Sequence, residues 1–168
     1  MGWPIRSADS PGETWVYDIA TGAVNEITNS LVGGLKRENF VQPQLAVYPS
    51  FDGTPIASFL YVPANIEADG SHPAIVYPHG GLTWQHMNDW FPFIQYFVNH
   101  GFVVAASNFR GSTGFGREFM ECNRKDCGGG DLRDCVAAVD FPKKTGMSMR
   151  GELRSWAGLG VATSHLWL

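Results

Sequence analysis

The residues with the clearest chemical potential are His79-Gly80-Gly81, which directly follow a short apolar run. Acyl-transfer chemistry needs preorganised backbone N–H groups that stabilise a developing oxyanion. Glycine permits the close approach and the unusual dihedral angles of such a turn. The triplet therefore fits an oxyanion-binding turn, although a Gly-Gly pair at the end of a strand fits an ordinary turn equally well.

The elements around this triplet predict an α/β fold. Residues 74–77 and 102–106 are continuous apolar runs, as expected for strands that are covered on both faces. Residues 92–99 between them predict a helix, because a proline is tolerated in its first turn and a glycine follows its end. A second helix is predicted after Gly130, with Asp131 as its N-cap. Strand, helix, strand, loop and helix in this order indicate parallel strand pairing.

The sequence before the triplet predicts β structure and connecting loops. Residues 14–17 and 24–28 are expected to form two short strands, and residues 31–44 a connector. Residues 45–48 and 56–62 flank an Asp-Gly turn and predict a β-hairpin.

Composition excludes several classes of protein. The chain is 44% hydrophobic with a net charge of −4, which is ordinary for a soluble globular protein and gives no basic footprint for nucleic acid. No apolar run reaches the roughly 20 residues needed to cross a bilayer. The start of the sequence does not resemble a signal peptide, so we expect a cytoplasmic protein. Cys122, Cys127 and Cys135 match no zinc signature and are expected to be reduced thiols; no metal or cofactor is predicted.

Two further glycine-rich segments turn the triplet into a specific pattern. Residues 108–116 read Asn-Phe-Arg-Gly-Ser-Thr-Gly-Phe-Gly, and residues 128–134 read Gly-Gly-Gly-Asp-Leu-Arg-Asp. Their order and spacing after His79-Gly80-Gly81 resemble the catalytic domain of the prolyl oligopeptidase family, particularly its acylaminoacyl-peptidase and dipeptidyl-peptidase branch. The resemblance covers roughly residues 45–145, and the first 30 residues resemble the last blade of that family's β-propeller.

The resemblance implies a domain organisation for the whole sequence. The expected fold is the N-terminal part of an α/β-hydrolase domain preceded by a remnant of a β-propeller blade. Its parts are expected at residues 1–30 for the blade remnant, 31–44 for the connector, 45–146 for the partial hydrolase domain and 147–168 for the tail discussed below.

The resemblance also implies roles for single residues. Gly81 would supply one oxyanion N–H and Gly80 would shape the turn, while the second donor would follow the nucleophile. His79 would then be structural and not the catalytic base. Asn108 and Arg110, with Gly111, would brace the loop beside the active site. A role in anchoring that loop by hydrogen bonds is as consistent with Asn108 and Arg110 as contact with substrate.

The nucleophile that this family uses is missing from the sequence. A Gly-x-Ser-x-Gly turn is expected after the helix that follows Gly130, and none occurs. Ser155 is followed by Trp-Ala-Gly, but Leu153 stands where the first glycine should be. The family's catalytic Asp and His follow the nucleophile in chain order and are absent as well. We therefore predict negligible peptidase or esterase activity, an expectation that a serine against a histidine beside Gly81 would contradict.

The tail offers an explanation for the missing turn. Codons can be chosen for residues 147–168 so that the neighbouring reading frame spells a strand, a Gly-Trp-Ser-Trp-Gly-Gly turn and the start of a helix. The serine of that turn would stand at the position of Leu159. A one-base deletion near Gly146 is the corresponding hypothesis.

Two other functions fit the sequence. The chain could be a small carboxylesterase that uses Ser112 or Ser155 with His79 or His165. It could also be a non-catalytic fragment, whose open sheet edge is covered by a complementing chain or by an oligomer. For an intact parent enzyme, the expected substrates are short or N-acylated peptides.

Overall fold

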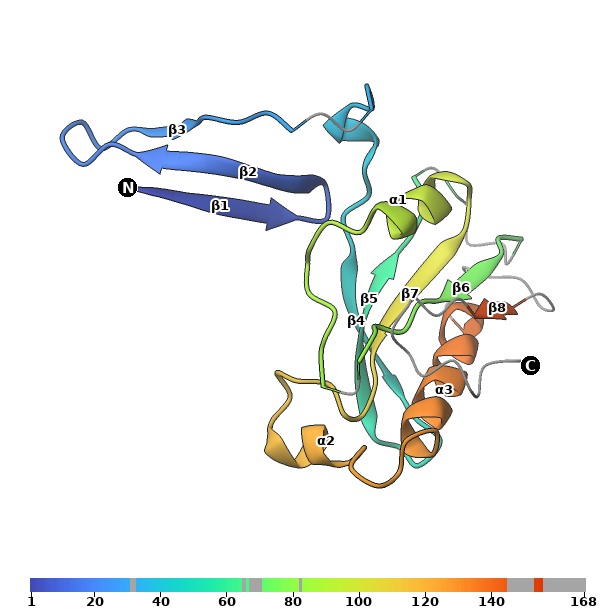
Figure 1. Ribbon diagram of the computed structural model, residues 1–168. Coiled ribbons are helices and arrows are strands. Elements are labelled where there is room, and N and C mark those ends of the chain that lie inside the picture. Colours follow the sequence, from blue (N-terminus) through green and yellow to red (C-terminus); the bar gives the residue numbers. More distant parts are fainter. Residues whose placement is uncertain (31–32, 65, 67–70, 82, 145–152, 156–168) are drawn as a thin grey trace.

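The computed structural model describes residues 1–30, 33–64, 66, 71–81, 83–144 and 153–155. Two sheets are present in this part of the chain (Figure 1), one of three antiparallel strands and one of five strands in the order β4-β5-β7-β6-β8. The strands are β1 (Gly2–Ser7), β2 (Ser10–Tyr17), β3 (Val24–Glu26), β4 (Gln44–Pro49), β5 (Pro55–Tyr61), β6 (Ala74–Val76), β7 (Val103–Asn108) and β8 (Leu153–Ser155). The helices are the 3₁₀ helix η1 (Arg37–Asn39) and the α-helices α1 (Pro92–Asn99), α2 (Arg117–Glu121) and α3 (Gly130–Lys144).

The five-stranded sheet contains the predicted α/β unit. Strands β6 and β7 are parallel and joined by α1, as the order of the apolar runs predicted. Strands β4 and β5 form the predicted antiparallel hairpin, whose Gly53 has a φ of +85° that suits glycine. Strand β7 lies between β5 and β6, so it pairs with one antiparallel and one parallel neighbour.

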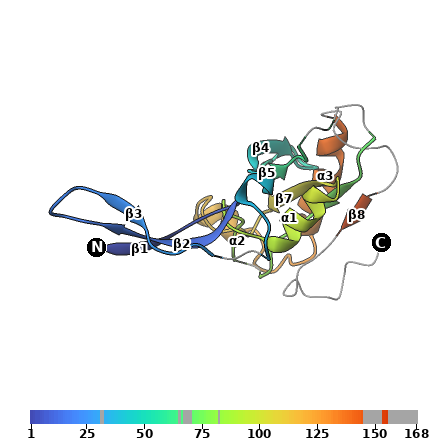
Figure 2. The same ribbon diagram turned by 90° about the horizontal axis from the view of Figure 1, so that it is seen from above.

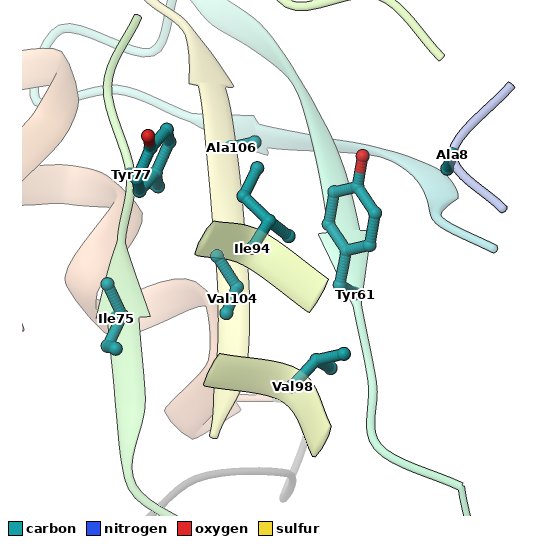
Figure 3. Close-up of a cluster of buried hydrophobic side chains, with 8 residues drawn as sticks. All are labelled: Ala8, Tyr61, Ile75, Tyr77, Ile94, Val98, Val104 and Ala106. Atoms are coloured by element: carbon teal, nitrogen blue, oxygen red, sulfur yellow. The ribbon is translucent and has the colours of Figure 1, made fainter. Parts of the chain in front are cut away.

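The two faces of this sheet are covered by different helices. On one face α1 packs Ile94 and Val98 against Val104 and Ala106 of β7, together with Tyr61 of β5 (Figure 3). Helix α3 covers the opposite face (Figures 1 and 2), where its Ala138 joins a second cluster. All six residues of β7 are buried because helices cover both of its faces, which explains the apolar run at its start, before Ser107 and Asn108.

The N-terminal sheet is built from β1, β2 and β3 and extends away from the five-stranded sheet (Figures 1 and 2). The expected strands at residues 14–17 and 24–28 correspond to β2 and β3. Strand β1 was not expected from the sequence. It contains Pro4, which lacks a backbone N–H, and this is tolerated because β1 lies at an edge of its sheet.

Helix α3 begins differently from the expectation. Its first residue is Gly130, so Asp131 lies inside the first turn and is not the N-cap. The capping acceptor is Asp126, whose Oδ2 accepts a hydrogen bond from the Gly130 N–H at 2.8 Å. The chain reaches this geometry through a turn in which Gly128 has a φ of +82°, so the cap comes from four residues before the helix.

The tail carries one described element. Strand β8 pairs with β6 in parallel, with Ile75 opposite Arg154. Ser155 is the last residue of this strand and therefore does not lie on a sharp turn after a strand. Within the described residues, no helix is long and apolar enough to cross a membrane.

Candidate active site around the His-Gly-Gly turn

The His-Gly-Gly turn lies just beyond the carboxyl end of β6. The N–H of Tyr77 still bonds to the carbonyl oxygen of Ala105 at 2.8 Å, so the chain leaves the sheet only after this residue. His79 is buried, whereas Gly81 is exposed and has a φ of +79°. A non-glycine residue would be strained in this left-handed conformation. The turn therefore presents Gly81 at the surface while its histidine points into the protein.

His79 forms a buried pair with Ser112. Its Nε2 lies 2.7 Å from the Ser112 hydroxyl oxygen, and neither side chain is accessible to solvent. The Ser112 hydroxyl also lies 2.6 Å from the carbonyl oxygen of Phe109, which can only accept. The contact with Phe109 is the shortest, so the hydroxyl proton goes there and His79 donates its Nε2–H to Ser112. The longer contact of the His79 Nδ1 with the Gly80 carbonyl oxygen, at 3.2 Å, then carries no proton in the neutral ring.

From the sequence, a serine against a histidine beside Gly81 was the expected sign of a nucleophile, and Ser112 and His79 form such a pair. The pair shows that proximity alone is too loose a criterion. A catalytic base must accept the proton of the serine. Here the imidazole is the donor, and the Phe109 ring stacks on it with centroids 4.3 Å apart. Burial lowers the pKa of His79, which keeps the ring neutral. The His79–Ser112 hydrogen bond therefore links the loop after β6 to the loop after β7 and has a structural role.

Asn108 fixes the loop that follows the His-Gly-Gly turn. Its Oδ1 accepts the N–H of His86 at 2.7 Å, and its Nδ2 donates to the carbonyl oxygen of the same residue at 3.2 Å. The His86 ring donates through Nε2 to the carbonyl oxygen of Tyr77 at 2.9 Å. Desolvation lowers the pKa of His86 to about 3, with a smaller contribution from nearby His79. A neutral imidazole thus closes the loop onto the end of β6.

Arg110 joins three segments that are distant in sequence. Its Nε and Nη2 donate to the two carboxylate oxygens of Asp134 on α3, each at 2.8 Å. Its Nη1 donates to Asp52 in the β4–β5 turn at 3.0 Å. Asp134 is fully buried and also accepts bonds from the Ser50 hydroxyl and from the Arg110 backbone N–H. These contacts are within the protein, so they describe anchoring of the loop after β7.

Gly111 is required by a close approach as well as by its dihedral angle. Its φ is +101°, and a Cβ atom at this position would lie 2.7 Å from the Cβ of Asn123. Real Cβ atoms do not come so near, so the loop after β7 and the segment after α2 depend on glycine here. The sequence singled out Gly111 through its motif, without identifying Asn123 as its neighbour.

The described structure brings several of the sequence-predicted residues together and leaves others apart. His79, Asn108 and Ser112 meet around the two loops that follow β6 and β7. Arg110 lies on the same loop but turns toward α3 and the β4–β5 turn. His165 falls outside the described residues. The described residues contain no group of three or more metal-ligating side chains that could hold an ion.

Sequence reasoning missed two important partners, His86 and Asp134. Asp134 stands inside the glycine-rich segment at residues 128–134, and a charged residue in an otherwise apolar helical face signals a buried partner. His86 has no such signal, because its role depends on the distance between the ends of β6 and β7. Only the folded chain shows that Asn108 reaches its backbone.

Comparison with known proteins identifies the class of protein that this arrangement represents. A probable dipeptidyl-peptidase 5 of Aspergillus terreus is 33% identical over 84% of this chain and 19% of its own length. The uncharacterized peptidase YuxL of Bacillus subtilis is 30% identical over 90% of this chain and 25% of its own. The solved puromycin-hydrolyzing peptidase of Mycobacterium tuberculosis superposes with a TM-score of 0.80 at 25% identity, over 94% of this chain and 24% of that one. These relatives place the mixed α/β fold among the peptidases.

The particular family follows from a match to its sequence profile. Residues 90–154 match the prolyl oligopeptidase family, so this segment includes the loop after β7, helix α3 and the first two residues of strand β8. The chain belongs to the prolyl oligopeptidase family of serine peptidases. It spans a quarter or less of the length of the curated relatives named above.

Proposed function

We propose that this chain forms the oxyanion side of a serine peptidase catalytic domain and that it has no peptidase or esterase activity by itself. The observation that carries the proposal is the contrast between Gly81 and Ser112. Gly81 is exposed at the end of β6, where an N–H donor is useful, whereas the nearest serine–histidine pair is buried and has its proton directed at Phe109. An oxyanion donor without a nucleophile leaves little of the rate enhancement of a complete triad.

The remaining parts of the proposal concern the parent enzyme. Its substrates would be short or N-acylated peptides, and β1–β3 would be a remnant of its β-propeller. The antiparallel pairing of β1, β2 and β3 supports a blade origin. A cytoplasmic location belongs to the same proposal and is testable by cell fractionation.

A reading-frame change near Gly146 remains our explanation for the missing nucleophile. What supports it is the absence of a Gly-x-Ser-x-Gly turn after α3, where the family has its nucleophile. The family match runs past Gly146 to residue 154, and β8 pairs with β6, so neither observation marks the point of a frame change. Sequencing the gene tests the hypothesis directly, because codons that cannot encode Gly-Trp-Ser-Trp-Gly-Gly in the neighbouring frame would end it.

Labelling with a fluorophosphonate is the decisive test of inactivity. We expect no stoichiometric adduct, measured by intact-protein mass spectrometry, and no burst of p-nitrophenol from p-nitrophenyl acetate. Ser112→Ala is the matched control, because Ser112 is the described serine that lies against a histidine. Stoichiometric labelling that Ser112→Ala abolishes would establish the alternative, a small esterase, and overturn the proposal.

A non-catalytic role as half of a split domain is supported by one specific observation. The edge strand β4 exposes Leu45 and Val47, both on the face that α1 covers farther along the sheet. Such an edge invites pairing or aggregation. Co-purification with a separate chain that carries the rest of the domain would support this role, and failure of the two chains to elute together in size-exclusion chromatography would contradict it.

A further inference from the structure

The turn between β1 and β2, residues 7–10, enters the hydrophobic core of the five-stranded part. Ala8 is fully buried and belongs to the cluster that contains Tyr61, Ile94 and Val98 (Figure 3). In Figure 1 this turn meets the segment that leads into α1. The N-terminal sheet is therefore attached through a small side chain that joins the same cluster as residues of β5 and α1.

Two side chains of the α/β part bind the backbone of this turn. The Asn88 Oδ1 accepts the N–H of Ala8 at 3.1 Å, and the Gln95 Nε2 donates to the Ala8 carbonyl oxygen at 2.9 Å. Gln95 also accepts the N–H of Val41 and donates to its carbonyl oxygen, both at 2.9 Å. Gln95 is buried, and both N–H groups of its amide are used. Loss of either bond would leave a buried polar group unpaired.

The loop that holds Asn88 is the loop that begins at the His-Gly-Gly turn. His86, two residues earlier, is held by both oxygen and nitrogen of the Asn108 side chain. The Asp89 N–H bonds to the Met87 carbonyl oxygen at 2.8 Å, which closes a tight turn around Asn88. The loop is thus bound by Asn108 at His86 and by the β1–β2 turn of the N-terminal sheet at Asn88.

We propose that Asn88 and Gln95 are positioning residues that couple the seating of the β1–β2 turn to the conformation of the loop that carries Gly81. When the turn is seated, Asn88 is fixed, and His86 keeps its geometry against Asn108. When the turn leaves, the anchor of this loop at Asn88 is lost, while the anchors at Trp84 and His86 remain. The importance of this coupling for catalysis rests on the proposed function, in which Gly81 is the oxyanion donor. The coupling itself is a property of the folded chain.

Hydrogen exchange of single amides, followed by NMR on the whole chain, tests the coupling without any activity. The reporters are the amide of His86 for the loop and the amide of Val104 for the sheet. In Asn88→Ala we expect His86 to exchange roughly tenfold faster, the effect of losing one hydrogen bond, while Val104 is unchanged. The matched control is Arg6→Ala. Arg6 contacts Asp89 on the same loop at 3.9 Å, but its side chain is 64% exposed, so we expect less than about a twofold change.

The reverse experiment uses the reciprocity of coupled sites. Asn108→Ala loosens the loop at the site end, and the amide of Ala8 should then exchange severalfold faster although the substitution does not touch it. If either variant fails to fold, the coupling is tested instead by amide hydrogen exchange of the unmodified chain at low concentrations of urea. The amides of Ala8 and His86 should then show one common opening free energy with one urea dependence.

The outcomes separate this coupling from the proposed function. An unchanged His86 amide in Asn88→Ala, or openings of Ala8 and His86 with different urea dependences, would overturn the coupling and leave the proposed inactivity standing. Fluorophosphonate labelling would overturn the proposed inactivity and leave the coupling standing.

Discussion

Replacing Arg110 with alanine should destabilise the fold by about 3 kcal/mol, because it leaves a buried carboxylate without its counter-ion. Asp134 is fully buried and receives two parallel bonds from the guanidinium, each at 2.8 Å. Removing one partner of a buried ion pair costs about 3–5 kcal/mol. The lower end applies here, since the Arg110 side chain is 14% exposed and Ser50 still donates to Asp134 in the variant.

Urea unfolding at pH 7, followed by tryptophan fluorescence and circular dichroism, measures this loss. The midpoint should fall while the slope stays constant, as expected when stability changes but the exposed surface does not. Asp52→Asn is the matched control, because it removes the other carboxylate from the same guanidinium. Asp52 is 37% exposed, so water replaces much of what is lost and the midpoint should move far less. Arg110→Lys keeps the charge without the planar fork and should fall between the two.

The comparison is decisive in either direction. Equal midpoints for Arg110→Ala and Asp52→Asn would refute the reasoning, because they would mean that burial of Asp134 does not make its pairing with Arg110 more important. A slope that changes in Arg110→Ala alone would indicate that the variant alters the unfolded or native ensemble, and its midpoint would then not measure the ion pair.

Three other predictions follow from the same loops. Gly111→Ala should lower the free energy of unfolding by about 1–3 kcal/mol more than Gly116→Ala in urea titrations, because both have positive φ but only the new Cβ at Gly111 meets a neighbour; equal losses would disprove the clash. Burial keeps His86 neutral and lowers its pKa to about 3, whereas in the unfolded chain His86 binds a proton below about pH 6.5. The free energy of unfolding should therefore be constant above about pH 6.5 and fall by up to about 1.4 kcal/mol per pH unit toward pH 3. His86→Gln should flatten that dependence in thermal melts. Ser112→Ala should cost about 1–3 kcal/mol by leaving the His79 donor unpaired, and a neutral result in chemical unfolding would remove Ser112 as a structural partner.

Local features of the fold could be predicted from the sequence because they depend on short spacings. The Asp-Gly turn requires a left-handed glycine, and Gly53 provides it between β4 and β5. Helix α1 follows from Pro92 at its start and the apolar residues on one face. The beginning of α3 was misplaced because its cap, Asp126, acts across a turn whose geometry the residue types do not specify.

By itself, the sequence determined the α/β class, the order β6, α1, β7, and the three glycine-rich segments that indicate the family. Tertiary structure decided which of the chemically suggestive side chains meet, and in which direction their protons point. His79 and Ser112 are 33 residues apart, and Arg110 and Asp134 are 24 apart. Such contacts depend on β7 inserting between β5 and β6, which brings their end loops together. A pattern of residue types encodes local backbone preference, whereas donors and acceptors acquire partners only when the sheet order is fixed.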